Sequence, residues 1–151
     1  MNDLEQKKFL FGTIFLLANK LQTIGDKHLQ GNITTKQWFL TVIVSQFLDN
    51  NPSLSEVAEA MGSSRQNVKQ LALKLHKNNY LQFVKQKDDS RITALKLTKE
   101  YEQYWSNRKN KDQQFILALF EDLSVEELNV MYTAFNKLVN KLKILNNETE
   151  N

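Results

Sequence analysis

Stretches of helical periodicity dominate the chain, and two of them, near its ends, carry long apolar stripes. The N-terminal stripe consists of Leu10, Ile14, Leu17, Leu21 and Ile24. The C-terminal stripe consists of Leu128, Met131, Phe135, Leu138, Leu142 and Leu145. Steps of three and four residues are typical of the contact seam between packed helices. The pattern therefore predicts two terminal helices, each with one continuous apolar face.

A short helix is predicted from Leu54. Ser53 and Glu56 have the spacing of a capping box, in which each side chain satisfies a backbone N–H of the first turn. Gly62 follows and can adopt the positive φ that ends a helix. The apolar positions of this segment have helical spacing and are Leu54, Val57, Ala58 and Met61.

A second helix, basic on its outer side, is predicted from about Arg65 to Lys77, with a serine cap at Ser63 or Ser64. Its apolar side consists of Val68, Leu71, Ala72 and Leu75. The opposite side carries Gln66, Lys69, Gln70 and Leu73, flanked by Asn67 and Lys74. Gln and Asn can bind adenine edges, and Lys can bind guanine or phosphate. Two helices joined by a tight turn, with the second one basic, indicate a helix-turn-helix; a merely solvated polar face is the alternative.

A β-hairpin is predicted after this helix. Residues 80–85 and 91–97 mix apolar and polar side chains, and the second segment alternates in part. Asn78 and Asn79 end the preceding helix, and the turn lies at residues 88–90. Arg91 stands at the tip with Lys85 and Lys87 nearby, and an Arg there can enter a narrow minor groove. We expect Asp89 to orient Arg91. A polar turn with an incidental Arg remains the alternative.

The charge distribution favours a nucleic-acid partner for this region. Between Gly62 and Lys87 there are six Lys or Arg residues and no Asp or Glu. A helix enters a DNA groove only if its exposed side tolerates phosphates. The whole chain is less informative, because its net charge is only +3. The absence of cysteine excludes disulfides and thiolate metal sites.

These segments together resemble the MarR family of bacterial regulators. The resemblance covers about residues 33–101 in matching order and rests on 33–38 (ITTKQW), 54–62 (LSEVAEAMG), 64–68 (SRQNV), 89–91 (DSR) and 97–98 (LT). Asn79 and Tyr101 depart from it, since both stand where the family usually has glycine. The resemblance implies a winged helix-turn-helix, a homodimer and control of transcription through DNA.

The resemblance also implies positions for the DNA-binding residues. It places Ser64, Gln66, Asn67, Lys69 and Gln70 on the recognition helix and Arg91 at the wing tip. Together with the charge pattern, the expected DNA-binding set is Ser64, Arg65, Gln66, Asn67, Lys69, Gln70, Lys74, Lys85, Lys87 and Arg91, with Asp89 as wing support.

We therefore expect a mainly α-helical chain with a small β-hairpin wing. Residues 1–151 form a single regulator chain, about 33–97 the winged helix-turn-helix lobe, and about 4–28 and 98–145 a helical dimerisation region. The dimerisation residues are Leu10, Ile14, Leu17, Leu128, Met131, Phe135, Leu138 and Leu142. Periodicity alone leaves packing within one chain open, and the family resemblance favours the dimer.

Other classes of function find little support in the sequence. Residues 9–18 resemble the apolar region of a signal peptide, but acidic residues precede them and no small-residue cleavage site follows, which favours a cytoplasmic packing helix. His28 and His76 are the only histidines and have no partners at catalytic or metal-binding spacing, so we expect neither an enzyme nor a metal or other cofactor.

The expected function is a sequence-specific transcriptional regulator that binds a pseudo-palindromic operator as a homodimer. A repressor is favoured over an activator, because occupying a promoter requires no further contacts. A small lipophilic or aromatic effector is a further expectation from the resemblance, with Phe11, Phe15, Trp38, Phe39 and Tyr104 as lining residues unless they are simply core. The alternative is a helical interaction module with a degenerate winged helix. The operator, the regulated genes and the effector are not readable from the sequence.

Overall fold

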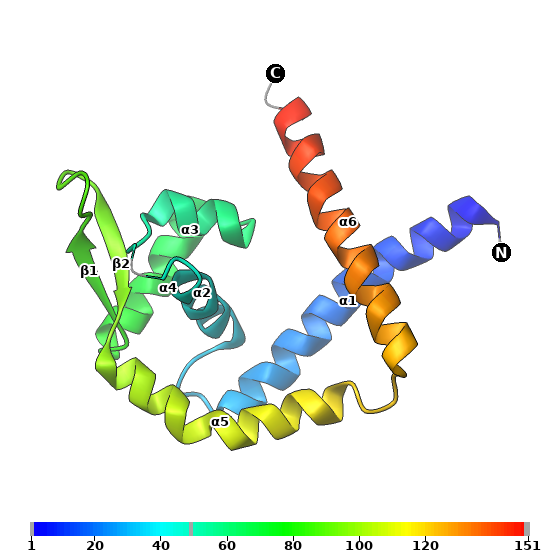
Figure 1. Ribbon diagram of the computed structural model, residues 1–151, viewed down its shortest axis with the longest axis horizontal. Coiled ribbons are helices and arrows are strands. Elements are labelled where there is room, and N and C mark those ends of the chain that lie inside the picture. The colour runs from blue at the N-terminus through cyan, green and yellow to red at the C-terminus, as the bar shows by residue number, and fades with distance from the viewer. Residues whose placement is uncertain (1, 49, 150–151) are drawn as a thin grey trace. The chain divides into compact units, whose positions relative to one another are not determined.

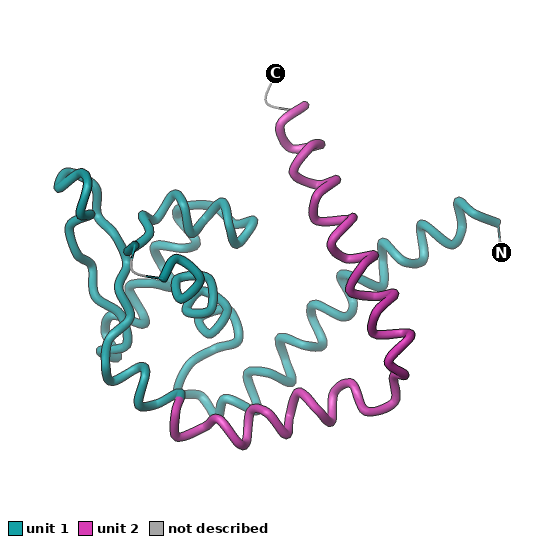
Figure 2. The backbone as a smooth tube through the Cα atoms, in the orientation of Figure 1, with its two compact units in different colours: residues 1–105 teal, residues 106–151 magenta. Residues whose placement is uncertain are grey.

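The computed structural model describes residues 2–48 and 50–149, which form six helices and one two-stranded antiparallel sheet (Figure 1). The elements in chain order are α1 (Asp3–Leu29), α2 (Thr35–Ser45), α3 (Leu54–Met61), α4 (Arg65–Lys77), β1 (Leu81–Lys85), β2 (Thr93–Leu97), α5 (Lys99–Leu119) and α6 (Val125–Thr149). This confirms the predicted fold class, a mainly helical chain with one small hairpin. The chain divides into two compact units, residues 1–105 and 106–151, and the boundary falls within α5 (Figure 2).

The helices begin where the sequence provides caps. Ser53 and Glu56 form the expected capping box at α3: the Glu56 backbone N–H donates to Ser53 Oγ at 3.2 Å, and the Ser53 N–H donates to Glu56 Oε2 at 2.7 Å. Ser124 and Glu127 form the same reciprocal pair at α6. Each box satisfies backbone donors that a helix start leaves without partners. Local sequence therefore fixes both helix starts.

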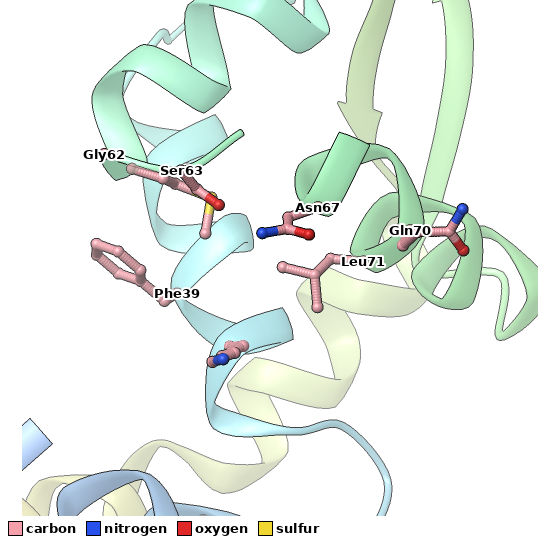
Figure 3. A pocket seen from close by; sticks show the side chains of 8 residues that line it. Phe39, Gly62, Ser63, Asn67, Gln70 and Leu71 are labelled. Atoms are coloured by element: carbon pink, nitrogen blue, oxygen red, sulfur yellow. The ribbon is translucent and has the colours of Figure 1, made fainter. Parts of the chain in front are cut away.

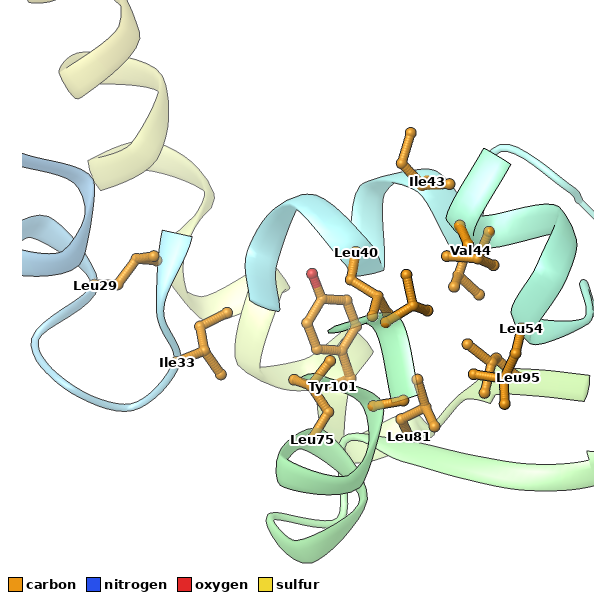
Figure 4. Packing of buried hydrophobic residues seen from close by; sticks show 14 residues of the cluster. Leu29, Ile33, Leu40, Ile43, Val44, Leu54, Leu75, Leu81, Leu95 and Tyr101 are labelled. Carbon is orange, nitrogen blue, oxygen red and sulfur yellow. The ribbon is translucent and has the colours of Figure 1, made fainter. Parts of the chain in front are cut away.

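The core of the first unit lies among α2, α3, α4 and the hairpin (Figure 4). Its fully buried side chains include Leu40 of α2, Val57 of α3, Leu75 of α4 and Leu81 and Leu95 of the sheet. Leu29 and Ile33, at the end of α1 and in the loop after it, belong to the same cluster. Burial of this apolar surface is the main force that holds the three central helices against the sheet.

The hairpin pairs Leu81 with Leu97 and Lys85 with Thr93, in antiparallel register. The return strand departs from the alternation expected for it, because Ala94 and Leu95 are both fully buried although they point to opposite faces. Ala94 forms a bridge with Ser53, and the Leu95 N–H donates to the Pro52 carbonyl at 2.8 Å. The chain just before α3 therefore lies along β2 and covers it.

Helix α1 is largely exposed. Of its residues only Gly25 and Leu29 are buried. Within the described residues, no helix is long and apolar enough to cross a membrane.

Candidate nucleic-acid interface

Helix α4 presents the exposed polar surface that the sequence predicts. Gly62 has φ +62° and turns the chain after α3, and Ser64 caps α4 by accepting the Asn67 N–H at 3.1 Å. Val68, Ala72 and Leu75 are fully buried, so the helix is fixed in rotation about its axis. This rotation leaves the expected residues exposed: Ser64, Arg65, Gln66, Asn67, Lys69, Gln70 and Lys74.

The cations around α4 and the hairpin have no acidic partner among the described residues. Arg65, Lys69 and Lys74 on the helix and Lys85 and Lys87 on the hairpin are exposed, and no ion pair forms with any of them in residues 2–48 and 50–149. A positive surface that is not neutralised internally attracts polyanions. These five side chains are therefore available to phosphates.

The tip of the hairpin holds Arg91 in a fixed orientation. Arg91 Nε donates to Asp89 Oδ1 at 3.0 Å, and Nη2 donates to Oδ2 at 2.9 Å, which is the bidentate geometry of an Arg–carboxylate pair. The Arg91 backbone N–H also donates to Asp89 Oδ1. The side-chain hydrogen bond from Arg91 lowers the pKa of Asp89, and the same bond raises the pKa of Arg91. The Arg91 side chain is 88% exposed, so the pair presents a guanidinium to solvent at the tip.

Two further contacts join the hairpin to the helices. His76, near the end of α4, has Nδ1 2.9 Å from the Leu81 carbonyl of β1, and its ring meets the edge of Phe83. Because a carbonyl only accepts, Nδ1 carries the proton. Gln86 donates to Glu56 Oε2 at 3.4 Å, a long contact from the hairpin to α3. Both contacts set the hairpin against the helix-turn-helix.

A cavity of about 440 Å³ lies on the flank of α4 (Figure 3). It is lined by Lys36 and Phe39 of α2, Met61, Gly62 and Ser63 at the turn, and Asn67, Gln70 and Leu71 of α4. Figure 3 shows Asn67 and Leu71 pointing toward Phe39 across this space. Neither Lys36 nor Ser63 was expected to line a binding site, because lining a cavity depends on how separate elements pack.

Of the five residues expected at an effector site, only Phe39 lines this cavity. Trp38 stacks on Trp105 with ring centroids 6.3 Å apart, and Tyr104 lies 5.2 Å from Tyr80 in the same aromatic cluster. Phe11 and Phe15 contact each other edge to face on α1, where they are 67% and 59% exposed.

The residues expected at a dimer interface lie on α1 and α6. Leu10, Ile14 and Leu17 are exposed on α1, as are Phe135, Leu138 and Leu142 on α6, whereas Leu128 and Met131 are half-buried. Among residues 2–48 and 50–149, no group of three or more His, Cys, Asp or Glu side chains is arranged to hold a metal ion.

Comparison with known proteins finds similarity in structure only. No protein-family model matches the sequence, and no curated protein does. A MarR/EmrR family transcriptional regulator from Acinetobacter sp. ADP1 has a similar structure, with a TM-score of 0.76 at 20% identity over 91% of this chain and 96% of that one. The regulator BldR from Sulfolobus solfataricus has a TM-score of 0.77 at 16% identity, covering 93% and 99%.

A third similar structure is MepR of S. aureus, solved as a complex with DNA. It has a TM-score of 0.72 at 19% identity and covers 93% of this chain and 99% of that one. The chain thus has the winged-helix fold of the MarR regulators over nearly its whole length. At these identities the likeness establishes the fold.

Proposed function

We propose that this chain is a DNA-binding transcriptional regulator of the MarR type. The observation that carries the proposal is the α4 surface: a capped helix, fixed by three fully buried residues, turns Gln66, Lys69 and Gln70 outward beside cations that have no internal partner. This is the arrangement that a recognition helix needs in a major groove. The winged-helix fold is used for DNA binding by the similar S. aureus MepR.

The wing supplies the second part of the interface. Asp89 holds the Arg91 guanidinium at the tip and leaves it 88% exposed. A narrow minor groove has enhanced negative potential and attracts such a side chain. The same carboxylate reduces the net charge of the tip, so Arg91 here provides a directed contact rather than a broad phosphate-binding surface.

We further propose that the chain acts as a homodimer. The stripe on α1 leaves Leu10, Ile14 and Leu17 between 41% and 54% exposed, and a large apolar surface of this kind usually marks an interface. Residues of about 4–28 and 98–145 would form the dimerisation region. A twofold dimer presents two recognition helices about 34–36 Å apart, or one DNA turn, and binds a pseudo-palindrome.

We propose repression as the mode of control and the cytoplasm as the place where the chain binds DNA. A small lipophilic or aromatic effector would release DNA by binding the incompetent dimer shape more tightly than the competent one. The candidates to contact it are Trp38 and Phe39 of α2 and Tyr104 of α5. Phe11 and Phe15 of α1 are further candidates.

The test is a DNA-selection assay on the purified protein, with the mass in solution measured and salt titrated. Enrichment of a pseudo-palindrome with half-sites about one turn apart supports the proposal. Weak binding without sequence preference that disappears at moderate salt would instead favour the alternative, a helical protein-interaction module with a degenerate winged helix.

Variants of α4 then separate base contacts from backbone contacts. Gln66→Ala and Gln70→Ala should each relax base preference by about 1–3 kcal/mol at one position of the half-site. Lys69→Ala should weaken binding to all DNA sequences alike and should reduce the slope of log affinity against log salt concentration by about one. Gln46→Ala, at an exposed position just after α2, is the matched control and should change neither quantity.

A further inference from the structure

Helix α1 crosses the start of α2 at unusually short range. Gly25 is buried in α1, and a Cβ placed there would lie 2.4 Å from Thr35 Oγ1 and 3.1 Å from Thr35 Cγ2. Any other residue at this position would therefore displace the Thr35 side chain or the helix that carries it. Gly12, in the same helix, has no atom within 4 Å of such a Cβ. Since glycine weakens a helix interior, its presence at position 25 is explained by the close approach.

Three hydrogen bonds hold the same crossing together. Asp26 Oδ1 accepts the Thr35 backbone N–H at 2.6 Å and faces the Thr35 hydroxyl at 2.8 Å. That hydroxyl also lies 3.2 Å from the Gln22 carbonyl, so its single proton is shared between two acceptors on α1. An α1 carboxylate thus satisfies a free N–H in the first turn of α2, beside the capping box of Thr34 and Gln37.

We propose that Gly25, Asp26 and Thr35 form a joint that sets the direction of α1 relative to the DNA-binding lobe, and thereby the operator spacing. The inference rests on the proposed function, because α1 carries the apolar stripe of the proposed dimer. If α1 leaves the lobe in one fixed direction, the two recognition helices of a dimer have one fixed separation. The joint is then a positioning device for DNA binding, without contact to DNA.

The lengths involved make the effect measurable. Relieving the Thr35 contact of a new Cβ requires a shift of about 1 Å, because non-bonded heavy atoms prefer about 3.5 Å. Leu29, buried in the core, is four residues from Gly25, or about 6 Å along the helix, so a pivot there gives a tilt of about 10°. Leu10 is about 28 Å from the same pivot and would move by about 5 Å. One base pair of spacing is about 3.4 Å.

The first experiment measures, without DNA, the distance between α1 and α3 within one chain. The chain has no cysteine, so spin labels can be placed at two new cysteines, Lys8→Cys on α1 and Glu59→Cys on α3, both exposed. Labelled protein is mixed with excess unlabelled protein so that the distance is measured within one chain. Gly25→Ala should shift that distance by up to about 5 Å, which is the displacement of Lys8 for a tilt of about 10°.

Three matched variants control this measurement. Gly12→Ala, the same substitution in open space on α1, should leave the distance unchanged. Gly25→Ala combined with Thr35→Ala should restore it, because the two atoms nearest to the new methyl group, Thr35 Oγ1 and Cγ2, are then absent. Asp26→Ala keeps the glycine but removes the acceptor, and should broaden the distance distribution; it decides the matter if Gly25→Ala does not fold.

The second experiment measures affinity for operators with identical half-sites and spacers changed by one base pair in each direction. Gly25→Ala should move the preferred spacing while base preference within each half-site stays the same. An unchanged label distance in folded Gly25→Ala overturns the joint, and a changed distance with an unchanged spacing profile overturns its role in spacing. If the wild-type protein selects no sequence, the proposed function fails and the spacing role fails with it, while the label distances still decide whether the joint fixes α1.

Discussion

The hydroxyl pair between Thr41 of α2 and Tyr101 of α5 offers a quantitative test of how the lobe is held together. The two oxygens are 2.5 Å apart, and the residues are 1% and 7% exposed. Thr41 Oγ1 also lies 2.6 Å from the Trp38 carbonyl, which only accepts. The Thr41 proton therefore goes to Trp38, and Tyr101 is the donor in the pair.

This assignment predicts the effects of three substitutions. Tyr101→Phe removes one buried hydrogen bond and leaves Thr41 bonded to Trp38, so the free energy of unfolding should fall by about 0.5–1.5 kcal/mol. Tyr101→Ala also removes the ring, which packs against Tyr80 and Trp105, and should cost about 3–5 kcal/mol, as for other large core aromatics. Combining Tyr101→Phe with Thr41→Val should show a coupling of about 0.5–1.5 kcal/mol.

Guanidinium unfolding followed by tryptophan fluorescence measures these quantities at the right place. The chain has only two tryptophans, Trp38 and Trp105, and they stack on each other beside Tyr101. Protein concentration is held constant because dimerisation would add to the apparent stability. If the slope of the unfolding free energy against guanidinium concentration is unchanged, the substitution has altered stability and not the compactness of the unfolded chain. A coupling near zero, or equal losses for Tyr101→Phe and Tyr101→Ala, would refute the reasoning.

Three further perturbations test the wing, the turn before it and the helix caps. Arg91→Ala should weaken binding most on operators with A-tract flanks, and Arg91→Lys should not restore it because lysine cannot form the bidentate pair with Asp89; equal losses on G·C-rich flanks would argue against groove entry. Asn79 has φ +60°, so Asn79→Ala should lower the unfolding free energy by about 1–2 kcal/mol relative to Asn79→Gly, measured by chemical denaturation; equal values would mean no backbone strain. The pKa values of Glu56 and Glu127 are lowered from 4.5, chiefly by the backbone N–H of the serine that each one caps. The contribution of these two carboxylates to the free energy of unfolding is therefore present above pH 4.5 and is lost as pH falls through the lower folded-state pKa. Glu56→Gln should flatten the acid side of a plot of melting temperature against pH. An unchanged plot would show that the Glu56 carboxylate does not stabilise the fold.

Local signals in the sequence were sufficient for the helix-turn-helix. The Ser53–Glu56 box, Gly62 and the Ser64 cap each act within a few residues, and the structure begins α3 and α4 and ends α3 at those positions. The outward side of α4 was also predictable, because its rotation follows from the apolar spacing of Val68, Ala72 and Leu75.

Other features depend on residues far apart in the chain, and no local pattern marks them. Tyr101 stands out in the sequence only because the family usually has glycine there, and its bond to Thr41, 60 residues away, was not predictable. The strand alternation failed at Ala94 because the chain near Ser53 pairs with β2 from outside the hairpin. The five aromatic residues expected at one effector site are divided between an exposed helix, an aromatic cluster and a cavity.

Residues close together in the chain specify the caps of α3 and α4, the end of α3 and the side of α4 that is buried, because capping, glycine φ and apolar periodicity act over one or two helical turns. They also specify the charge that α4 and the wing present. The contact of His76 between the wing and α4 and the close approach of Gly25 to Thr35 depend instead on tertiary packing. Those contacts arise where separately specified surfaces meet, and their geometry depends on the packing of the whole lobe rather than on any neighbouring residue.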